Sequence, residues 1–166
     1  LRTPFIECEK QMTEVDGEPV DIGYVGKIKS INRGILDLLS NDQWIPVIAP
    51  IGTDAEGNSY NINADTVAAE VAMAVEAEKL ILLTDVEGIK DSEGHVIYEA
   101  TIHQINDMIA DGTISGGMIP KVQGCTRAID GGVNGVHIID GRIPHCLLLE
   151  IFTKTGIGSM IKSDKY

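Results

Sequence analysis

A chain of 166 residues with 43% hydrophobic and 23% charged residues has the composition of one soluble globular domain. This balance excludes a disordered tail, and the longest apolar runs fall far short of the roughly 20 residues that a membrane helix needs. Thirteen Lys and Arg against 25 Asp and Glu give a net charge of -12, which repels nucleic-acid phosphates and anionic lipid. We therefore expect no nucleic-acid or membrane partner, and any anionic ligand needs a local binding site.

The cysteines and histidines indicate neither a disulfide framework nor a metal site. Cys8, Cys125 and Cys146 form an odd set without a C-x-x-C pair, which is typical of buried thiols in a reducing, cytoplasmic compartment. The four histidines are scattered and lack H-E-x-x-H spacing, so we expect no resident metal. The chain starts at Leu1 without a basic or apolar leader, so we expect no signal peptide; a piece of something longer fits this start.

Short β-branched runs alternate with helical periods from Asp21 onward, which predicts an α/β domain. Residues 1–20 are polar and irregular, so we interpret them as a leader and residues 21–166 as the domain. The first half of this domain is predicted to contain, in chain order, a strand at 22–31, a helix at 32–39, a buried strand at 44–51, a hairpin-type loop at 53–58 and a returning strand at 60–62.

The second half begins with a helix that Asn63 caps and that runs to about Ala77. Thr101 is a second predicted cap, and Pro120 fits the first turn of another helix. The remaining predicted elements are a strand at 79–84, a two-stranded ribbon at 90–98, helices at 101–110 and 119–130, a strand at 136–140, a helix at 144–152 and a closing strand at 159–162.

Two glycines, Gly116 and Gly117, precede a predicted helix whose first turn contains Lys121. Backbone N–H groups and the positive end of the helix dipole attract an anion, and the ammonium adds a charge that can follow a moving phosphoryl group. The alternative is a solvated lysine beside an ordinary loop. A lysine in the first turn opposes the dipole, however, and this local cost favours phosphate binding.

Three polar side chains, Asn61, Asn63 and Asp65, gather where a predicted strand leads into a helix. Alternation along the strand places the two asparagines on one side, and Asp65 points back from the first helical turn. Plain helix capping explains Asn63 and Asp65 but leaves Asn61 without a role. As a site, the three side chains offer an amide for a carboxylate or amide substrate, and a carboxylate that can hold lysines in place.

Asp85 follows a predicted strand at the position where open α/β sheets bind ligands, although a lone Asp there is also a common loop-starting residue. The chain contains no G-x-x-x-x-G-K-[ST], no G-x-G-x-x-G after the first strand and no G-x-S-x-G. These absences exclude a P-loop NTPase and argue against a dinucleotide-binding or serine-hydrolase motif. The glycines at 156 and 158 are explained equally well by a tight turn into an edge strand.

Five segments, taken together and in order, resemble the amino-acid kinase family, in the branch that phosphorylates N-acetyl-L-glutamate in arginine biosynthesis. They are DIGYVG at 21–26, YNINAD at 60–65, LTDVEGI at 83–89, GGMIPK at 116–121 and GIGSMI at 156–161. The resemblance implies a three-layer αβα sandwich with a mainly parallel sheet, of which this chain is the carboxy-terminal, nucleotide-binding part. It also implies transfer of the γ-phosphoryl group of ATP to the side-chain carboxylate, by positioning and charge stabilisation.

The resemblance also implies roles for individual residues. Lys121 corresponds to the lysine that stabilises the migrating phosphoryl group, and Asp65 to the carboxylate that orients lysines. Asn61 and Asn63 correspond to the substrate site, and Mg²⁺ is expected to arrive with ATP rather than on protein ligands. The nucleotide cradle implied by the family consists of Thr84, Asp85, Val86, Glu87, Gly88, Ile89, Thr113, Ile114, Ser115, Gly116 and Gly117.

The family's N-terminal half has no counterpart in this sequence. That half carries a K-x-G-G motif with a second lysine, another glycine pair and a substrate-binding arginine, and residues 1–20 hold no glycine pair. The sequence therefore leaves two functions open: a kinase acting on N-acetyl-L-glutamate, and a catalytically inactive nucleotide-binding fragment or regulatory domain. A homo-oligomer is expected for the full-length parent.

Overall fold

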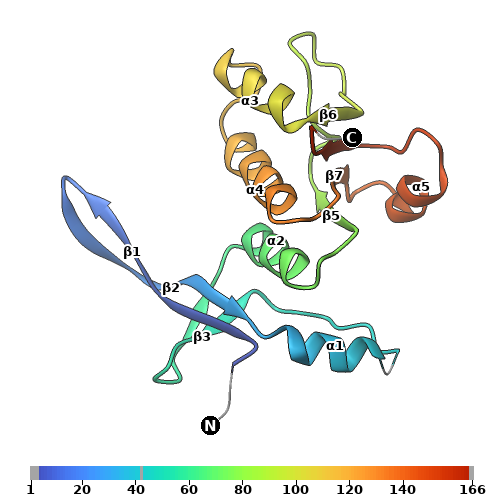
Figure 1. Cartoon of the computed structure of the whole chain (residues 1–166). Helices are drawn as coiled ribbons and strands as arrows, with labels where there is room; N and C mark the ends of the chain where they lie inside the picture. Colours follow the sequence, from blue (N-terminus) through green and yellow to red (C-terminus); the bar gives the residue numbers. More distant parts are fainter. Residues whose placement is uncertain (1–3, 42, 165–166) are drawn as a thin grey trace. The chain divides into compact units, whose positions relative to one another are not determined.

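The computed structural model describes residues 4–41 and 43–164, which form two compact units, Leu1–Val75 and Glu76–Tyr166. Each unit has its own sheet and its own helices, coloured from blue to green and from green to red in Figure 1. Among the residues that the structure describes, no helix combines the length and apolar character that crossing a bilayer requires. The two units are considered in turn.

The first unit opens with a long antiparallel hairpin of β1 (Ile6–Val15) and β2 (Glu18–Ile31). The expectation of an irregular leader is therefore wrong for the described part of residues 1–20; residues 1–3 lie outside it. Asp16 and Gly17 both adopt positive φ, 54° and 84°, as a two-residue hairpin turn requires. The strand predicted at 22–31 is confirmed as the larger part of β2. The polar composition hid β1, because most of its side chains are exposed and no apolar alternation marks it.

A second hairpin, β3 (Ile51–Thr53) and β4 (Ser59–Asn61), completes the strand pairing of this unit. The pairings run in a closed ring, β1-β2-β4-β3, because β3 lies parallel to β1 and β4 lies parallel to β2. Inside the ring the strands approach closely, since a Cβ on Gly52 would lie 2.7 Å from the Sγ of Cys8. The core of the unit is formed by Ile6, Cys8, Tyr60, Ile62 and Val67.

Two helices belong to the first unit, α1 (Arg33–Asn41) and α2 (Ala64–Ala74). Both lie where the sequence predicts helices, and the side chain of Asn63 accepts the N–H of Thr66 at 3.0 Å, which confirms Asn63 as the cap of α2. The helix ends at Ala74, three residues before the predicted end.

Residues 44–49 form an extended segment but no strand, so the prediction of a buried strand at 44–51 is wrong except for its end in β3. Ile45 is 89% exposed and Val47 is 96% exposed. Pro46 and Pro50 remove two N–H donors from the segment, and a proline cannot donate to a strand ladder. This apolar segment therefore has the composition of a strand but does not pair with a neighbouring strand.

The second unit contains a four-stranded sheet in the order β5-β7-β8-β6. Its strands are β5 (Lys79–Thr84), β6 (Glu99–Thr101), β7 (Gly135–Asp140) and β8 (Ser159–Lys162). β5 pairs with β7 in parallel along its whole length, β6 pairs with β8 in parallel, and only the central β7–β8 pair is antiparallel. The mainly parallel sheet is confirmed in this unit.

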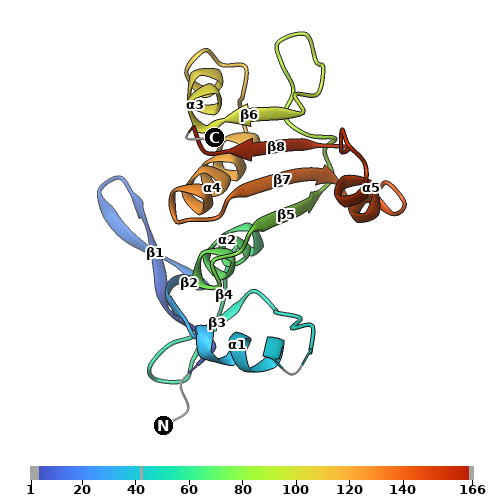
Figure 2. The same cartoon turned by 45° about the vertical axis from the view of Figure 1, so that its right-hand side comes forward.

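Three helices cover this sheet: α3 (Ile102–Ala110), α4 (Met118–Asp130) and α5 (Cys146–Phe152). In Figure 1, where the sheet is seen nearly edge-on, α3 and α4 lie on one side of it and α5 lies on the other, and Figure 2 shows the four strands side by side. The three-layer αβα arrangement is thus confirmed within the second unit. Between Lys90 and Val96 the predicted ribbon reduces to one isolated bridge.

The core of the second unit is aliphatic, and Ile105, Val122, Ile138 and Ile161 have no exposed surface. Gly158 permits the tightest contact in this core, because a Cβ there would collide with the carbonyl oxygen of Ile138. All three thiols of the chain are free and buried, as the sequence predicts, and burial raises the pKa of Cys8.

Candidate functional site

A cavity of about 390 Å³ opens at the carboxyl ends of β5 and β7 in the second unit. Two loops form most of its wall, the loop that follows β5 and the glycine-containing loop that leads into α4. This is the edge at which open α/β sheets place their ligands, and the volume falls within the usual range of small-molecule pockets. The lining residues are Asp85, Val86, Glu87, Gly88, Ile89, Lys90, Thr113, Ile114, Ser115, Met118 and Arg142.

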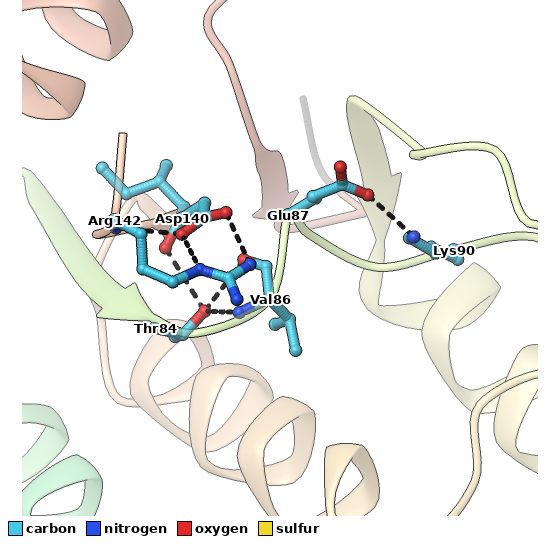
Figure 3. A network of polar contacts seen from close by, with 7 residues as sticks. Thr84, Val86, Glu87, Lys90, Asp140 and Arg142 are labelled. Atoms are coloured by element: carbon cyan, nitrogen blue, oxygen red, sulfur yellow. Dashed lines mark hydrogen bonds and ion pairs between the residues drawn. The ribbon is translucent and has the colours of Figure 1, made fainter. Parts of the chain in front are cut away.

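Thr84 holds the loop after β5 in place, although its side chain does not line the cavity (Figure 3). Its Oγ1 accepts the N–H of Val86 at 3.1 Å and lies within hydrogen-bond distance of the carbonyls of Val86 and Ile139. The carbonyl of Thr84 accepts the N–H of Gly141 at 2.8 Å. Because these bonds join the ends of β5 and β7, the cavity wall is tied to two neighbouring strands.

Asp140, the last residue of β7, binds Arg142 through three hydrogen bonds (Figure 3). Its carboxylate accepts the backbone N–H, Nε and Nη2 of Arg142 at 2.9, 2.9 and 2.8 Å. The side chain of Asp140 is 7% exposed and that of Arg142 is 65% exposed. Hydrogen bonds from Arg142 lower the pKa of Asp140 to about 2, so this carboxylate stays charged at neutral pH.

The floor of the cavity is anchored to β8. The N–H of Ile89 donates to the Oγ of Ser159 at 2.8 Å, and Ser159 is buried. Gly88 passes so close to this serine that a Cβ would lie 2.6 Å from its Oγ. At the rim, Lys90 and Glu87 form an ion pair of 2.7 Å in which both side chains are about half exposed. Because Gly88 has no side chain, the loop after β5 can pass close to Ser159.

The glycine-containing loop enters α4 through a tight turn. Gly116 has a φ of 58°, and Gly117 caps the helix without a side-chain hydrogen bond. The N–H groups of Met118 and Ile119 already donate within this turn, to carbonyls at 3.3 and 3.2 Å. The start of α4 therefore offers fewer free backbone donors than the sequence predicts, and Lys121 is the group that we expect to attract phosphate.

The predicted substrate residues lie in the first unit. Asn61 ends β4, and Asn63 uses its Oδ1 to cap α2, so the capping explanation is confirmed for Asn63. Asp65 lies in the first turn of α2, as predicted. The substrate-binding roles of Asn61 and Asn63, and the role of Asp65 in orienting lysines, stay predictions.

Eight of the eleven predicted nucleotide-binding residues line one cavity, and three of them do not. The exceptions are Thr84, which supports the wall from behind, and the pair Gly116 and Gly117, which shape the turn into α4. Sequence reasoning missed Lys90, Met118 and Arg142. Arg142 could have been found, because it follows the carboxyl end of β7 as Asp85 follows the neighbouring β5.

A second cavity of about 480 Å³ lies beside β7, β8 and the segment after α5. The Nδ1 of His137 and the Oε1 of Glu150 are 2.6 Å apart, and the other carboxylate oxygen accepts the N–H of Ile157 at 2.7 Å. Burial raises the pKa of Glu150, but hydrogen bonds from Ile157 and His137 outweigh it, so the net shift is downward. The Nε2 of His137 is buried without a partner among the described residues.

No group of three or more His, Cys, Asp or Glu side chains that could hold a metal ion occurs within residues 4–41 and 43–164. The charged side chains of the first cavity are Asp85, Glu87, Lys90 and Arg142, two of each sign. The site therefore has cations and hydrogen-bond donors for an anionic ligand together with carboxylate oxygens.

The sequence of this chain is similar to those of several known proteins. Acetylglutamate kinase of Sulfurihydrogenibium sp. is 58% identical over 144 residues, which are 87% of this chain and 48% of that protein. Acetylglutamate kinase of Caldicellulosiruptor saccharolyticus is 55% identical over 159 residues, which are 95% of this chain and 54% of that protein. The chain thus spans about half the length of these relatives.

Among solved structures, N-acetylglutamate synthase from Neisseria gonorrhoeae, complexed with coenzyme A and N-acetyl-glutamate, matches with a TM-score of 0.90. The identity is 26%, and the match covers 98% of this chain and 37% of that chain. The model of the amino acid kinase family matches residues 6–140, a span that includes most of both cavity loops. This chain therefore belongs to the amino acid kinase family.

Proposed function

We propose that this chain is the nucleotide-binding part of an acetylglutamate kinase, which transfers the γ-phosphoryl group of ATP to the side-chain carboxylate of N-acetyl-L-glutamate. The observation that carries the proposal is the cavity at the ends of β5 and β7, whose second wall leads directly into the helix of Lys121. Relatives at 58% and 55% identity bear the name of this enzyme. We propose that this reaction belongs to arginine biosynthesis and takes place in the cytoplasm.

Catalysis in this proposal depends on positioning and charge. The ammonium of Lys121, in the first turns of α4, stabilises the negative charge that develops on the phosphoryl group. Asp65 orients lysines, and Asn61 and Asn63 bind the acetylated substrate. Mg²⁺ is expected to arrive bound to ATP, where it would neutralise phosphate charge.

A second candidate function is nucleotide binding without turnover, as in a regulatory domain or a part that needs a partner. The observation behind it is that the chain spans about half the length of its relatives. Loss of one preorganised charge-stabilising donor typically costs about 10²–10³ in rate. Because the sequence has no K-x-G-G motif for a second lysine, we expect this chain alone to turn over slowly or not at all. The full-length parent is expected to be a homo-oligomer.

Titration calorimetry with ADP and ATP tests the nucleotide site directly. We expect saturable binding, and Lys121→Ala should weaken ATP more than adenosine because the lysine contacts phosphate. Lys79→Ala is the matched control, since Lys79 begins β5 at the end of the strand away from the cavity. Absence of binding at millimolar nucleotide would overturn the proposal.

A coupled ADP-release assay with N-acetyl-L-glutamate separates the two candidate functions. Slow turnover that rises when the missing half of a relative is added supports the kinase, with the chemistry divided between two parts. Nucleotide binding without any turnover, alone or with that half, supports the regulatory alternative. The same assay run with glutamate and with carbamate tests the choice of acceptor.

A further inference from the structure

We propose that Arg142 is a base-side contact of the bound nucleotide, whose guanidinium plane stacks against the purine ring while Asp140 holds it in place. This inference rests on the proposed nucleotide site and adds to it a residue that none of the sequence motifs contains. It divides the cavity into a base side, at the ends of β5 and β7, and a phosphate side, at the start of α4.

The geometry fixes the guanidinium before any ligand binds. Asp140 accepts Nε and Nη2 along one edge of the fork at 2.9 and 2.8 Å, and it also accepts the backbone N–H of Arg142. Figure 3 shows this pair at the ends of the two parallel strands. Since three bonds hold one residue to one buried carboxylate, the side chain of Arg142 loses little further rotamer freedom when a ligand arrives.

The part of the Arg142 side chain that does not contact Asp140 borders the cavity. Its side chain is 65% exposed and lines the cavity, although its carboxylate partner is 7% exposed. Within the described part of the chain, Asp140 is the one hydrogen-bond partner of the guanidinium, so Nη1 and the planar faces remain available. A planar, weakly hydrated cation of this kind stacks well on aromatic rings.

The charged side chains of the site indicate where the base and the phosphates of the nucleotide would lie. The positive charge of Arg142 is compensated by Asp140, and the carboxylates of Asp85 and Glu87 lie in the same cavity wall. The pairs Asp140–Arg142 and Glu87–Lys90 each balance their own charge, so Arg142 attracts a phosphate less strongly than an unpaired arginine would. Lys121 lies on α4, three residues beyond Met118, which lines the cavity. The uncharged purine is therefore the part of the nucleotide that fits beside the guanidinium.

The apolar lining of the cavity supports the same placement. Val86 and Ile114 contribute aliphatic surface to the cavity that Arg142 borders. Ile114 is 3% exposed, so it forms a fixed part of the wall. A purine between this surface and the guanidinium would bury both of its faces, whereas a phosphate would leave the apolar surface unused.

The test compares adenosine, ADP and ATP on the same set of variants by titration calorimetry. Arg142→Lys keeps a charge beside Asp140 but removes the planar fork, and Arg142→Ala removes both. We expect each to weaken adenosine and ADP by the same factor, about three- to tenfold from the usual strength of such stacking contacts. Lys121→Ala is the phosphate-side comparison and should weaken ATP while leaving adenosine unchanged. Lys79→Ala should change none of the three affinities.

Each outcome has a distinct meaning. If the Arg142 variants weaken ATP but leave adenosine unchanged, Arg142 is a phosphate contact and the inference is wrong. If they bind all three ligands like the wild-type chain, the inference fails and the nucleotide site stands. If the wild-type chain binds none of them, the inference and the proposed function both fail. Thermal unfolding of each variant shows whether it is folded, and Arg142→Lys carries the test if Arg142→Ala is not.

Discussion

Two segments that the sequence predicts as buried or paired strands differ sharply in the structure. In β7, all six residues from Gly135 to Asp140 are buried, and the strand is paired with β5 on one side and β8 on the other. In residues 44–49 of the first unit, Ile45 and Val47 are almost fully exposed. The difference shows that an apolar, β-branched run is not sufficient to form a buried strand. A strand also needs a neighbouring strand whose backbone pairs with its N–H and C=O groups.

Backbone hydrogen bonds explain much of the contrast. Each residue of β7 pairs in register with β5, from Gly135 opposite Lys79 to Asp140 opposite Thr84. In the extended segment Pro46 lacks an N–H, and Ile51 at its end donates to Ala49 only two residues away. A cavity of about 230 Å³ separates part of this segment from α1, so its packing is also incomplete.

The largest expected effect comes from core deletions in the two segments. Ile138→Ala in β7 removes a side chain with no exposed surface, and we expect it to lower the free energy of unfolding by about 2–5 kcal/mol. Val47→Ala should change it by no more than about 0.5 kcal/mol, because little surface is buried there. Urea denaturation followed by far-ultraviolet circular dichroism measures both. Equal losses would show that residues 44–49 are packed in solution.

A second comparison concerns carboxylates. Glu150 is 6% exposed and accepts the N–H of Ile157 beside His137, whereas Asp21 pairs with Lys10 on the exposed hairpin. Glu150→Ala leaves buried donors unpaired, and we expect a loss of about 3 kcal/mol in unfolding free energy. Asp21→Ala removes an exposed ion pair worth at most about 1 kcal/mol.

Glu150→Gln is the control for this comparison, because it keeps an acceptor for Ile157 and removes the charge. It should cost less than Glu150→Ala in the same urea titration. A loss as large as that of the alanine variant would mean that the charge opposite His137, rather than the hydrogen bond to Ile157, stabilises the segment after α5.

The two units also differ in how far the sequence predicted them. In the second unit, β5 and β8 begin and end at the predicted residues, because short apolar runs bounded by turns are buried there in a mainly parallel sheet. In the first unit, the sequence predicts the part of β2 from residue 22 to residue 31 but misses β1, because its exposed side chains show no apolar alternation. The Asp16–Gly17 turn was the available signal for it.

The same distinction holds for the candidate site. Residues 85–89 and 113–115, which the family resemblance assigned to one nucleotide site, do line one cavity. Arg142 was missed because it reaches the cavity only through the register of β7 against β5, which is a long-range pairing. The dyad of His137 and Glu150 was missed for a related reason, since it joins a strand to a helix 13 residues later.

A smaller expected effect concerns the helix caps of the two units. The Oδ1 of Asn63 caps α2 by accepting the N–H and the hydroxyl of Thr66, whereas Thr101 and Gln104 form a reciprocal capping box at α3. We expect Asn63→Ala and Thr101→Ala each to cost about 1 kcal/mol in unfolding free energy. In Thr101→Ala the side chain of Gln104 still accepts the backbone N–H of residue 101, so we expect the two losses to be similar. Asn63→Asp is the control that keeps an acceptor, and it should recover most of the stability.

The last prediction concerns the pH dependence of stability in acid. Hydrogen bonds from Arg142 hold the pKa of Asp140 at about 2, below its usual value of 3.8. A carboxylate whose pKa is lowered by folding stabilises the folded state above its unfolded pKa, and this contribution is lost as the pH falls through the folded pKa. The contribution of Asp140 should therefore be complete at neutral pH and decline between about pH 4 and pH 2. Urea midpoints of the wild-type chain and Asp140→Asn at pH 6, 3.5 and 2.5 isolate it, because the other carboxylates titrate in both proteins. We expect the difference between the two proteins to shrink as the pH falls; a difference that stays constant would mean that Asp140 is not held in its charged form by Arg142.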